Sequence, residues 1–280
     1  ARTKKLKKQL EGLDMAEKMV NELLTAGLNT LAGTAVSTYQ SLAKELGNYY
    51  LPGPQLLVSR MVMEMEAIQD KPEEASRHYR NATRLLLQLS STIQKARAYL
   101  EDKMDKGEVD TDYSILYEAL GGIWKLDELE GIGAMRENVP LVQLSFDVSY
   151  DEARKEYIDR GYWMDLTTGR ISQSLQYRPV KALKYVKEED TNFGLLTATK
   201  LYTYPGELNC RIRWDGAVLS PVTAVTLRQI KEKAQPDVAA AAKLLKNQIK
   251  TTLSPKYAGM LLAFSRIGRI GDETVLEDKD

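Results

Sequence analysis

The feature that most constrains this chain is a long stripe of apolar residues at helical spacing between residues 72 and 105. Pro72 suits the first turn of a helix and Asp70 suits its N-cap, because proline has no N–H to donate there and aspartate can accept one. A helix of this length is unusual in a globular domain, and its apolar side must be covered by other elements. The stripe consists of Tyr79, Ala82, Leu86, Leu89, Ile93, Ala96 and Leu100.

Three shorter helical patterns precede the long helix and can cover its stripe. They lie at about residues 13–31, 34–46 and 55–69. We therefore predict a compact helical bundle rather than a coiled-coil arm, which would need apolar heptads throughout. The breaks between the helices are expected at Gly27, Gly33, Gly47 and Leu51–Pro54.

The second half of the chain alternates apolar and polar residues over short stretches between Pro/Gly turns, which is the pattern of β-strands. Thr167-Thr168-Gly169 is expected to turn one hairpin, and Asp215-Gly216 is expected to be a second turn. Helical patterns return after Pro221 and from Pro236. Strands are expected at residues 141–148, 162–166, 171–177, 195–204 and 209–214, and a strand-like stretch at 257–270 precedes an acidic tail that we expect to be solvated.

These patterns predict an α+β fold with its domain boundary near Gly131. A helical bundle domain would cover residues 1–131, and an α+β domain would cover residues 132–280. The second domain would have a β-rich segment at 141–218, a mixed and mainly antiparallel sheet, and packed C-terminal helices. Residues 151–159 suit either a helical turn or a hairpin loop, and residues 179–186 suit either a helix start or another strand.

The charge balance and the single cysteine exclude several classes of partner and site. The 39 basic and 39 acidic residues cancel, so only local patches could draw the chain to nucleic acid or an anionic surface. One cysteine excludes an internal disulfide framework and a cysteine-based zinc site, and it fits a reducing, cytoplasmic compartment. No apolar run approaches the roughly 18 residues that span a bilayer, so no membrane partner is expected.

The sequence motifs of common catalytic sites are absent. The chain has no Gly-x-x-x-x-Gly-Lys loop, no Gly-x-Gly-x-x-Gly helix start and no Gly-x-Ser-x-Gly elbow. His78, the only histidine, is interpreted as a surface or hydrogen-bonded residue and not as the base of a nucleophile. The acidic run Glu188–Asp190 is interpreted as a solvated turn, although a magnesium site or an acid pair there stays open. We therefore expect no catalytic residue, no metal ligand set and no cofactor.

The remaining candidate site residues are aromatic and basic. Guanidinium forks and aromatic faces suit contacts with phosphates and bases, which makes these residues candidates for binding nucleic acid or another partner. The structural alternative places the arginines on the outer face of a strand, with tyrosine and tryptophan closing the edge of the core. The candidates are Tyr177, Arg178, Lys181, Arg211, Arg213 and Trp214.

Several segments resemble bacterial SWIM zinc-finger proteins. The basic opening Arg-Thr-Lys-Lys-Leu-Lys-Lys-Gln-Leu-Glu-Gly-Leu, continued through Leu28, is similar to the linker and short helix that follow the finger in that family. Trp163–Gly169, Tyr177–Pro179 and Tyr204–Asn209 are similar to the later part of such proteins. The resemblance covers most of the chain and implies binding of nucleic acid or protein through the finger, with no catalytic residues.

The finger itself does not fit this chain. It needs three cysteines and a histidine in the order Cys-x-Cys…Cys-x-His, and the chain has one cysteine. The finger is therefore expected upstream of Ala1, or the protein is a finger-less relative. In either case the binding role of the finger cannot be assigned to any residue here.

We therefore expect a non-enzymatic interaction or scaffold module of a cytoplasmic complex, with a protein partner and a contact to nucleic acid as a further option. The alternative is a nucleotide- or metal-dependent enzyme that uses carboxylates and the Arg/Tyr set of the β-rich half. The two hypotheses differ in whether the candidate arginines and Lys181 converge with an acidic cluster on one concave surface.

Overall fold

The structure is a computed structural model that describes residues 2–31, 36–107, 113–250, 253 and 258–278. Its contacts divide the chain into two compact units, Ala1–Trp124 and Lys125–Asp280. The first is helical and the second contains a β-barrel with helices, so the α+β fold class is confirmed. The sequence pattern placed the boundary near Gly131, and the contacts assign the short helix α6 (Leu126–Gly131) to the second unit.

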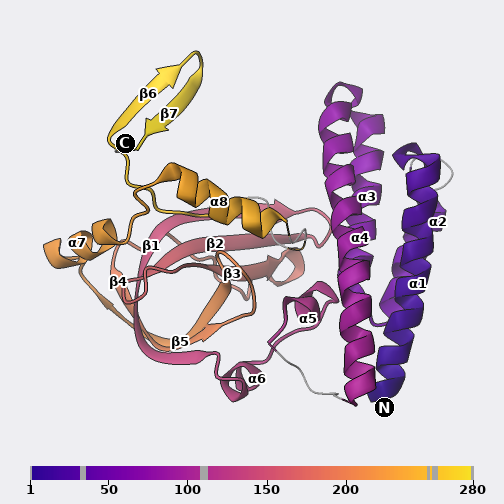
Figure 1. The fold of residues 1–280 in the computed structure, drawn as a ribbon, viewed down its shortest axis with the longest axis horizontal. Coiled ribbons are helices and arrows are strands. Elements are labelled where there is room, and N and C mark those ends of the chain that lie inside the picture. Colours follow the sequence, from indigo (N-terminus) through magenta and orange to yellow (C-terminus); the bar gives the residue numbers. More distant parts are fainter. Residues whose placement is uncertain (1, 32–35, 108–112, 251–252, 254–257, 279–280) are drawn as a thin grey trace. The chain divides into compact units, whose positions relative to one another are not determined.

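Helices α1 to α4 form the core of the first unit, drawn from indigo to purple in Figure 1. The long predicted helix is α4, and its stripe residues Leu89, Ile93 and Leu100 are buried within the apolar core that the four helices share. The first unit consists of α1 (Arg2–Ala26), η1 (Leu28–Leu31), α2 (Val36–Asn48), α3 (Pro52–Asp70), η3 (Pro72–Glu74), α4 (Ala75–Lys106) and α5 (Ile115–Ala119).

The two ends of α4 are set by proline and glycine. Lys71, which precedes Pro72, leaves the helical region with φ of −137° and ψ of 75°, because the residue before a proline is disfavoured there. The predicted N-cap at Asp70 was wrong, since Asp70 is the last residue of α3 and a 3₁₀ turn leads into α4. At the other end, Gly107 adopts φ of 64° and its N–H donates to the carbonyls of Lys103 and Met104.

The second unit is built on a five-stranded barrel that closes in the order β1-β2-β3-β5-β4 (Figure 1). Strand β1 is long and pairs with both β2 and β4. Neighbouring strands are antiparallel except β3 and β5, which pair in parallel only through Gln173–Arg211 and Ser174–Ile212. The sheet is thus mixed and mainly antiparallel, as predicted. The strands are β1 (Met135–Asp151), β2 (Glu156–Asp165), β3 (Ile171–Pro179), β4 (Leu195–Thr203) and β5 (Arg211–Ser220).

Alternation of side chains gives the barrel an inner apolar cluster. Trp163 of β2 and Ile212 of β5 are buried in it, and the indole N–H of Trp163 donates to Ser174 Oγ over 3.0 Å. Gly161 leaves room for this contact, because a Cβ at that position would lie 2.6 Å from the indole nitrogen.

A second apolar cluster lies on the outer side of the barrel. Met164, the neighbour of Trp163, packs there with Val142 against Ile230 of α7 and Leu261. The segment around Leu261 is held by Asn209, whose amide exchanges hydrogen bonds of 2.9 and 2.8 Å with the backbone of Gly259. The helices of this unit are α6, η4 (Val180–Ala182), α7 (Ala224–Glu232) and α8 (Val238–Ile249).

The predicted turn at Asp215-Gly216 was wrong, because both residues lie inside β5. Gly216 has φ of 73°, and Asn138 of β1 has φ of 54° at the same level on the other side of β4. Left-handed residues within strands mark tight bends of a barrel wall. The Asp-Gly pair therefore bends the strand here instead of reversing the chain.

Three stretches whose structure was open or predicted otherwise take defined forms. The 151–159 stretch contains a hairpin turn followed by the start of β2, and the 179–186 stretch contains the 3₁₀ turn η4. The acidic tail contributes strand β7 (Glu273–Glu277), which pairs with β6 (Arg266–Ile270). Its expected solvated state is confirmed for Asp272, Glu273 and Glu277, which are exposed, and Glu277 also accepts a hydrogen bond of 2.5 Å from Arg266 Nε. Residue 257 of the predicted 257–270 strand lies outside the described residues. The prediction was wrong for residues 258–265, which form no continuous strand, and right for Arg266–Ile270, which forms β6.

Candidate functional site

The outer face of β2, β3 and β5 brings together part of the predicted set. The register places Gln173 of β3 beside Arg211 of β5 and Arg160 of β2 beside Leu175 of β3. Tyr177 lies two residues beyond Leu175 on β3. Because side chains alternate along a strand, all of these residues share one outer face. Along β3, Tyr177 lies about 13 Å from Gln173, the residue that pairs with Arg211.

Tyr177 is exposed on this face beside the turn between β1 and β2. The residue is 38% exposed. The guanidinium carbon of Arg154, from that turn, lies 5.8 Å from the centre of the tyrosine ring, which is within reach of a cation–π contact. Arg154 Nε also lies 3.0 Å from the Glu156 carboxylate, which positions the arginine at the edge of the face.

The arginines of β2 and β5 differ in how firmly they are held. Arg211 is half-buried, with its guanidinium carbon 3.7 Å from the centre of the Tyr204 ring. Arg160 Nη1 lies 3.7 Å from the Asp147 carboxylate, which is a loose, partly exposed ion pair. Arg213 is exposed, and within the described ranges it has no hydrogen bond or ion pair. We call this set the Arg/Tyr face: Arg154, Arg160, Tyr177, Arg211 and Arg213.

Arg178 points to the inside of the barrel, although it follows Tyr177 directly. It is buried, and its Nε and Nη2 donate to the Asp159 carboxylate over 2.8 and 2.7 Å. Asp159 also accepts the backbone N–H of Glu189 over 2.9 Å. Arg178 therefore joins the barrel wall to the segment between β3 and β4, and it does not share a surface with Arg211.

The acidic run in this segment is pinned to the barrel and not simply solvated. The side chain of Glu188 is 75% exposed and lies 3.8 Å from Arg178, whereas Glu189 is half-buried. Burial, followed by the negative charge of Asp159, raises the pKa of the Glu189 carboxyl. Nearby, the N–H of Asn192 donates to Gln143 Oε1 over 2.7 Å. These carboxylates are thus separated from the outward arginines of β5.

Trp214 and Lys181 take positions apart from the Arg/Tyr face. The Trp214 ring packs edge-on against Trp163, with 5.1 Å between the ring centres, on the inner side of the barrel. Lys181 is exposed on η4, after the end of β3. Sequence reasoning had not named Arg154 and Arg160. Arg160 shares the outer face of β2 with Ile158 and Tyr162, and apolar residues on both sides of it gave no pattern that marks an outward arginine.

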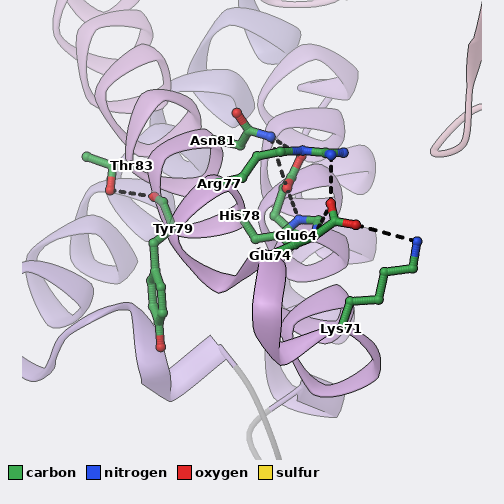
Figure 2. Close-up of polar contacts among 8 residues, drawn as sticks. All are labelled: Glu64, Lys71, Glu74, Arg77, His78, Tyr79, Asn81 and Thr83. Carbon is green, nitrogen blue, oxygen red and sulfur yellow. Dashed lines mark hydrogen bonds and ion pairs between the residues drawn. The ribbon is translucent and has the colours of Figure 1, made fainter.

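His78 belongs to a polar cluster of the first unit that Figure 2 shows in detail. It is buried, its Nδ1 lies 2.7 Å from the Glu64 carboxylate on α3, and its Nε2 lies 4.0 Å from that of Glu74. Asn81 donates to both oxygens of Glu64 over 3.2 and 3.3 Å, and Arg77 contacts Glu74 at 2.6 Å. The histidine is therefore hydrogen-bonded within the contact between α3 and α4.

Cys210, the only cysteine, is buried near the turn between β4 and β5. Burial raises the pKa of its thiol, although the nearby Arg170 acts in the opposite direction. Arg170 Nη2 lies 2.8 Å from its sulfur. A protonated thiol is a poor nucleophile, so this environment does not activate Cys210.

Within the part of the chain that the structure describes, no group of three or more His, Cys, Asp or Glu side chains is placed to hold a metal ion. Across the same ranges, none of the helices combines the length and the apolar character needed to cross a bilayer.

Comparisons with protein-family models, with curated proteins and with solved structures found no match to this chain. The resemblance to SWIM zinc-finger proteins therefore stays a prediction. The function has to be inferred from the barrel and its surface.

Proposed function

We propose that this chain is a non-enzymatic interaction module whose barrel contacts nucleic acid through the Arg/Tyr face. The observation that carries this proposal is the placement of Arg154 and Arg211 on the same outer face as exposed Tyr177, with Arg213 two residues beyond Arg211 on β5. Guanidinium groups bind phosphates through paired N–H donors, and aromatic rings stack on bases. The face is thus a local basic and aromatic surface in a chain whose formal net charge is +0.

The strand order supports the same function at the level of the fold. The OB-fold is a five-stranded, partly open Greek-key barrel that binds oligonucleotides or oligosaccharides through strands 2 and 3 and the loops β1–β2 and β4–β5. The present barrel also has five strands, joins β3 to β5 through only two residue pairs, and carries Arg154 in its β1–β2 turn. A shared fold does not define a ligand by itself. The likeness to the OB-fold is therefore secondary support for nucleic-acid binding, after the placement of the arginines.

The scaffold part of the proposal concerns a protein partner in a cytoplasmic complex. It is supported by the balanced charge of the chain, which leaves partner choice to local surfaces. It is also supported by the division into two compact units, because each can present a separate surface. The alternative of an enzyme has less support, since Glu188 and Glu189 lie near Arg178 and Asp159 and not near Arg211.

The test is the affinity of the full chain for a fluorescent oligonucleotide at low salt, measured by anisotropy. Replacing both Arg154 and Arg213 by glutamine removes two cations from the face, and we expect about a tenfold or larger loss of affinity. The matched control replaces Lys243 and Lys246, both exposed on α8 of the same unit, by glutamine. Equal losses in the two double variants, or no binding by the wild-type chain, would contradict the proposal.

A further inference from the structure

We infer that the nucleic acid held by the Arg/Tyr face is a single strand, with one of its bases stacked on the ring of Tyr177. The inference rests on the proposed function and adds the kind of strand that the site accepts. It depends on the surroundings of Tyr177 and on the ion pairs that the arginines of the Arg/Tyr face already make.

Tyr177 is placed as a stacking platform. Its neighbours on the same outer face are Leu175 and Pro179 along β3 and Ile158 across on β2, so the ring stands on an apolar floor. Within the described residues its hydroxyl has no hydrogen-bond partner. Tyr177 is 38% exposed although Arg154 lies over its ring at 5.8 Å, so a base that stacks here shares the ring with the arginine or displaces it.

An aromatic platform distinguishes single strands from duplexes. In a duplex the faces of the bases are covered by their neighbours, and only base edges reach the grooves. An unpaired base can turn out and place its whole face against a side chain. A ligand that uses the ring of Tyr177 must therefore be unpaired where it meets the ring.

The charges on the face also favour a single strand over a duplex. Arg154 and Arg160 are accompanied by Glu156 and Asp147, so their cations are partly neutralised, and Arg213 is the member without an ion pair among the described residues. Binding of duplex DNA without sequence preference depends on many phosphate contacts. With few free cations, stacking has to supply much of the affinity, and only a single strand offers it.

The experiment compares three probes on the full chain: a 12-nucleotide single strand, the same strand in a duplex, and a single strand of the same length without bases. We expect the single strand to bind about tenfold or more tightly than either other probe. Tyr177→Leu should lower its affinity about tenfold, whereas Tyr177→Phe, which keeps the ring, should stay within about twofold of wild type. Tyr185→Leu is the control, because Tyr185 is 77% exposed and lies outside the face.

The outcomes separate the two levels of the proposal. Equal binding of all three probes, or an unchanged affinity in Tyr177→Leu, would overturn the single-strand inference while leaving nucleic-acid binding intact. Failure of every probe to bind would overturn the proposed function itself. Thermal unfolding of each variant at the wild-type temperature would show that a loss of affinity reflects the site and not the fold.

Discussion

Asp159 accepts two hydrogen bonds from the guanidinium of Arg178 inside the barrel, at 2.8 and 2.7 Å, and a third from the backbone of Glu189 at 2.9 Å. Asp159 is fully buried, so its charge has no access to water. A buried carboxylate is tolerated only when such partners compensate for its lost hydration. The pair therefore connects β2, β3 and the segment that leads to β4.

Asp159→Leu should destabilise the second unit, because it leaves the guanidinium of Arg178 buried without its partner. We expect a loss of about 3 kcal/mol in the free energy of unfolding, measured by urea denaturation followed by tryptophan fluorescence. Glu188→Leu is the control, since the Glu188 side chain is 75% exposed and should change stability by less than about 0.5 kcal/mol. An equal effect of the two substitutions would mean that the inner ion pair does not hold the barrel.

Glu189 should make the stability of the barrel depend on pH. Its pKa is raised by burial and by Asp159, so the folded state favours the protonated carboxyl. The contribution of the protonated Glu189 carboxyl to the free energy of unfolding is fully present below the ordinary carboxyl pKa. It is lost as pH rises through the raised pKa. Glu189→Gln should therefore gain stability relative to wild type between pH 4 and pH 7. Thr191→Ala, in the same segment, is the control: its free energy of unfolding should differ from that of wild type by the same amount at pH 4 and at pH 7.

Gly161→Ala should destabilise the barrel, because the added Cβ would lie 2.6 Å from the indole nitrogen of Trp163 and 2.8 Å from Gln143 Nε2. Overpacking of this kind typically costs about 1–3 kcal/mol. Gly131→Ala is the matched control, since nothing lies within 4 Å of a Cβ there. Trp163 fluorescence should report the difference, and similar stability of the two variants would contradict the close packing.

Glu64→Ala tests the polar contact between α3 and α4 in the first unit (Figure 2). It removes the acceptor of His78 and of Asn81, and it should cost about 1–3 kcal/mol of helical stability. Circular dichroism at increasing urea concentration measures this loss. Glu22→Ala, exposed on α1, should stay close to wild type. If both substitutions have the same effect, the cluster is not a structural contact.

The helical half of the fold could be predicted because its apolar periodicity reports burial directly. The stripe that contains Leu89 and Ile93 became the buried side of α4, and the hairpin turn at Thr167–Gly169 joined β2 to β3 as predicted. The turn at Asp215-Gly216 could not be predicted correctly, because Asp-Gly is a strong hairpin signal. Whether a left-handed glycine reverses or bends a strand depends on its neighbours, which here are distant in the sequence.

The candidate site could be predicted only in part. Tyr177 and Arg178 are adjacent in a strand, so one must face outward and the other inward, and both residue types suit either side. The buried partner that decides the orientation, Asp159, lies 19 residues earlier on β2. The same limit applies to Arg154, which reaches Tyr177 only because the strands pair in the observed register.

The most direct measurement of the proposed function is the salt dependence of oligonucleotide binding. The logarithm of the binding constant falls with the logarithm of salt concentration, and each phosphate contact adds about 0.7 to the slope for single strands. We predict that Arg213→Gln makes the slope shallower by about 0.7, whereas Lys243→Gln leaves it unchanged. An Arg213→Gln slope equal to that of wild type would contradict nucleic-acid binding through the Arg/Tyr face.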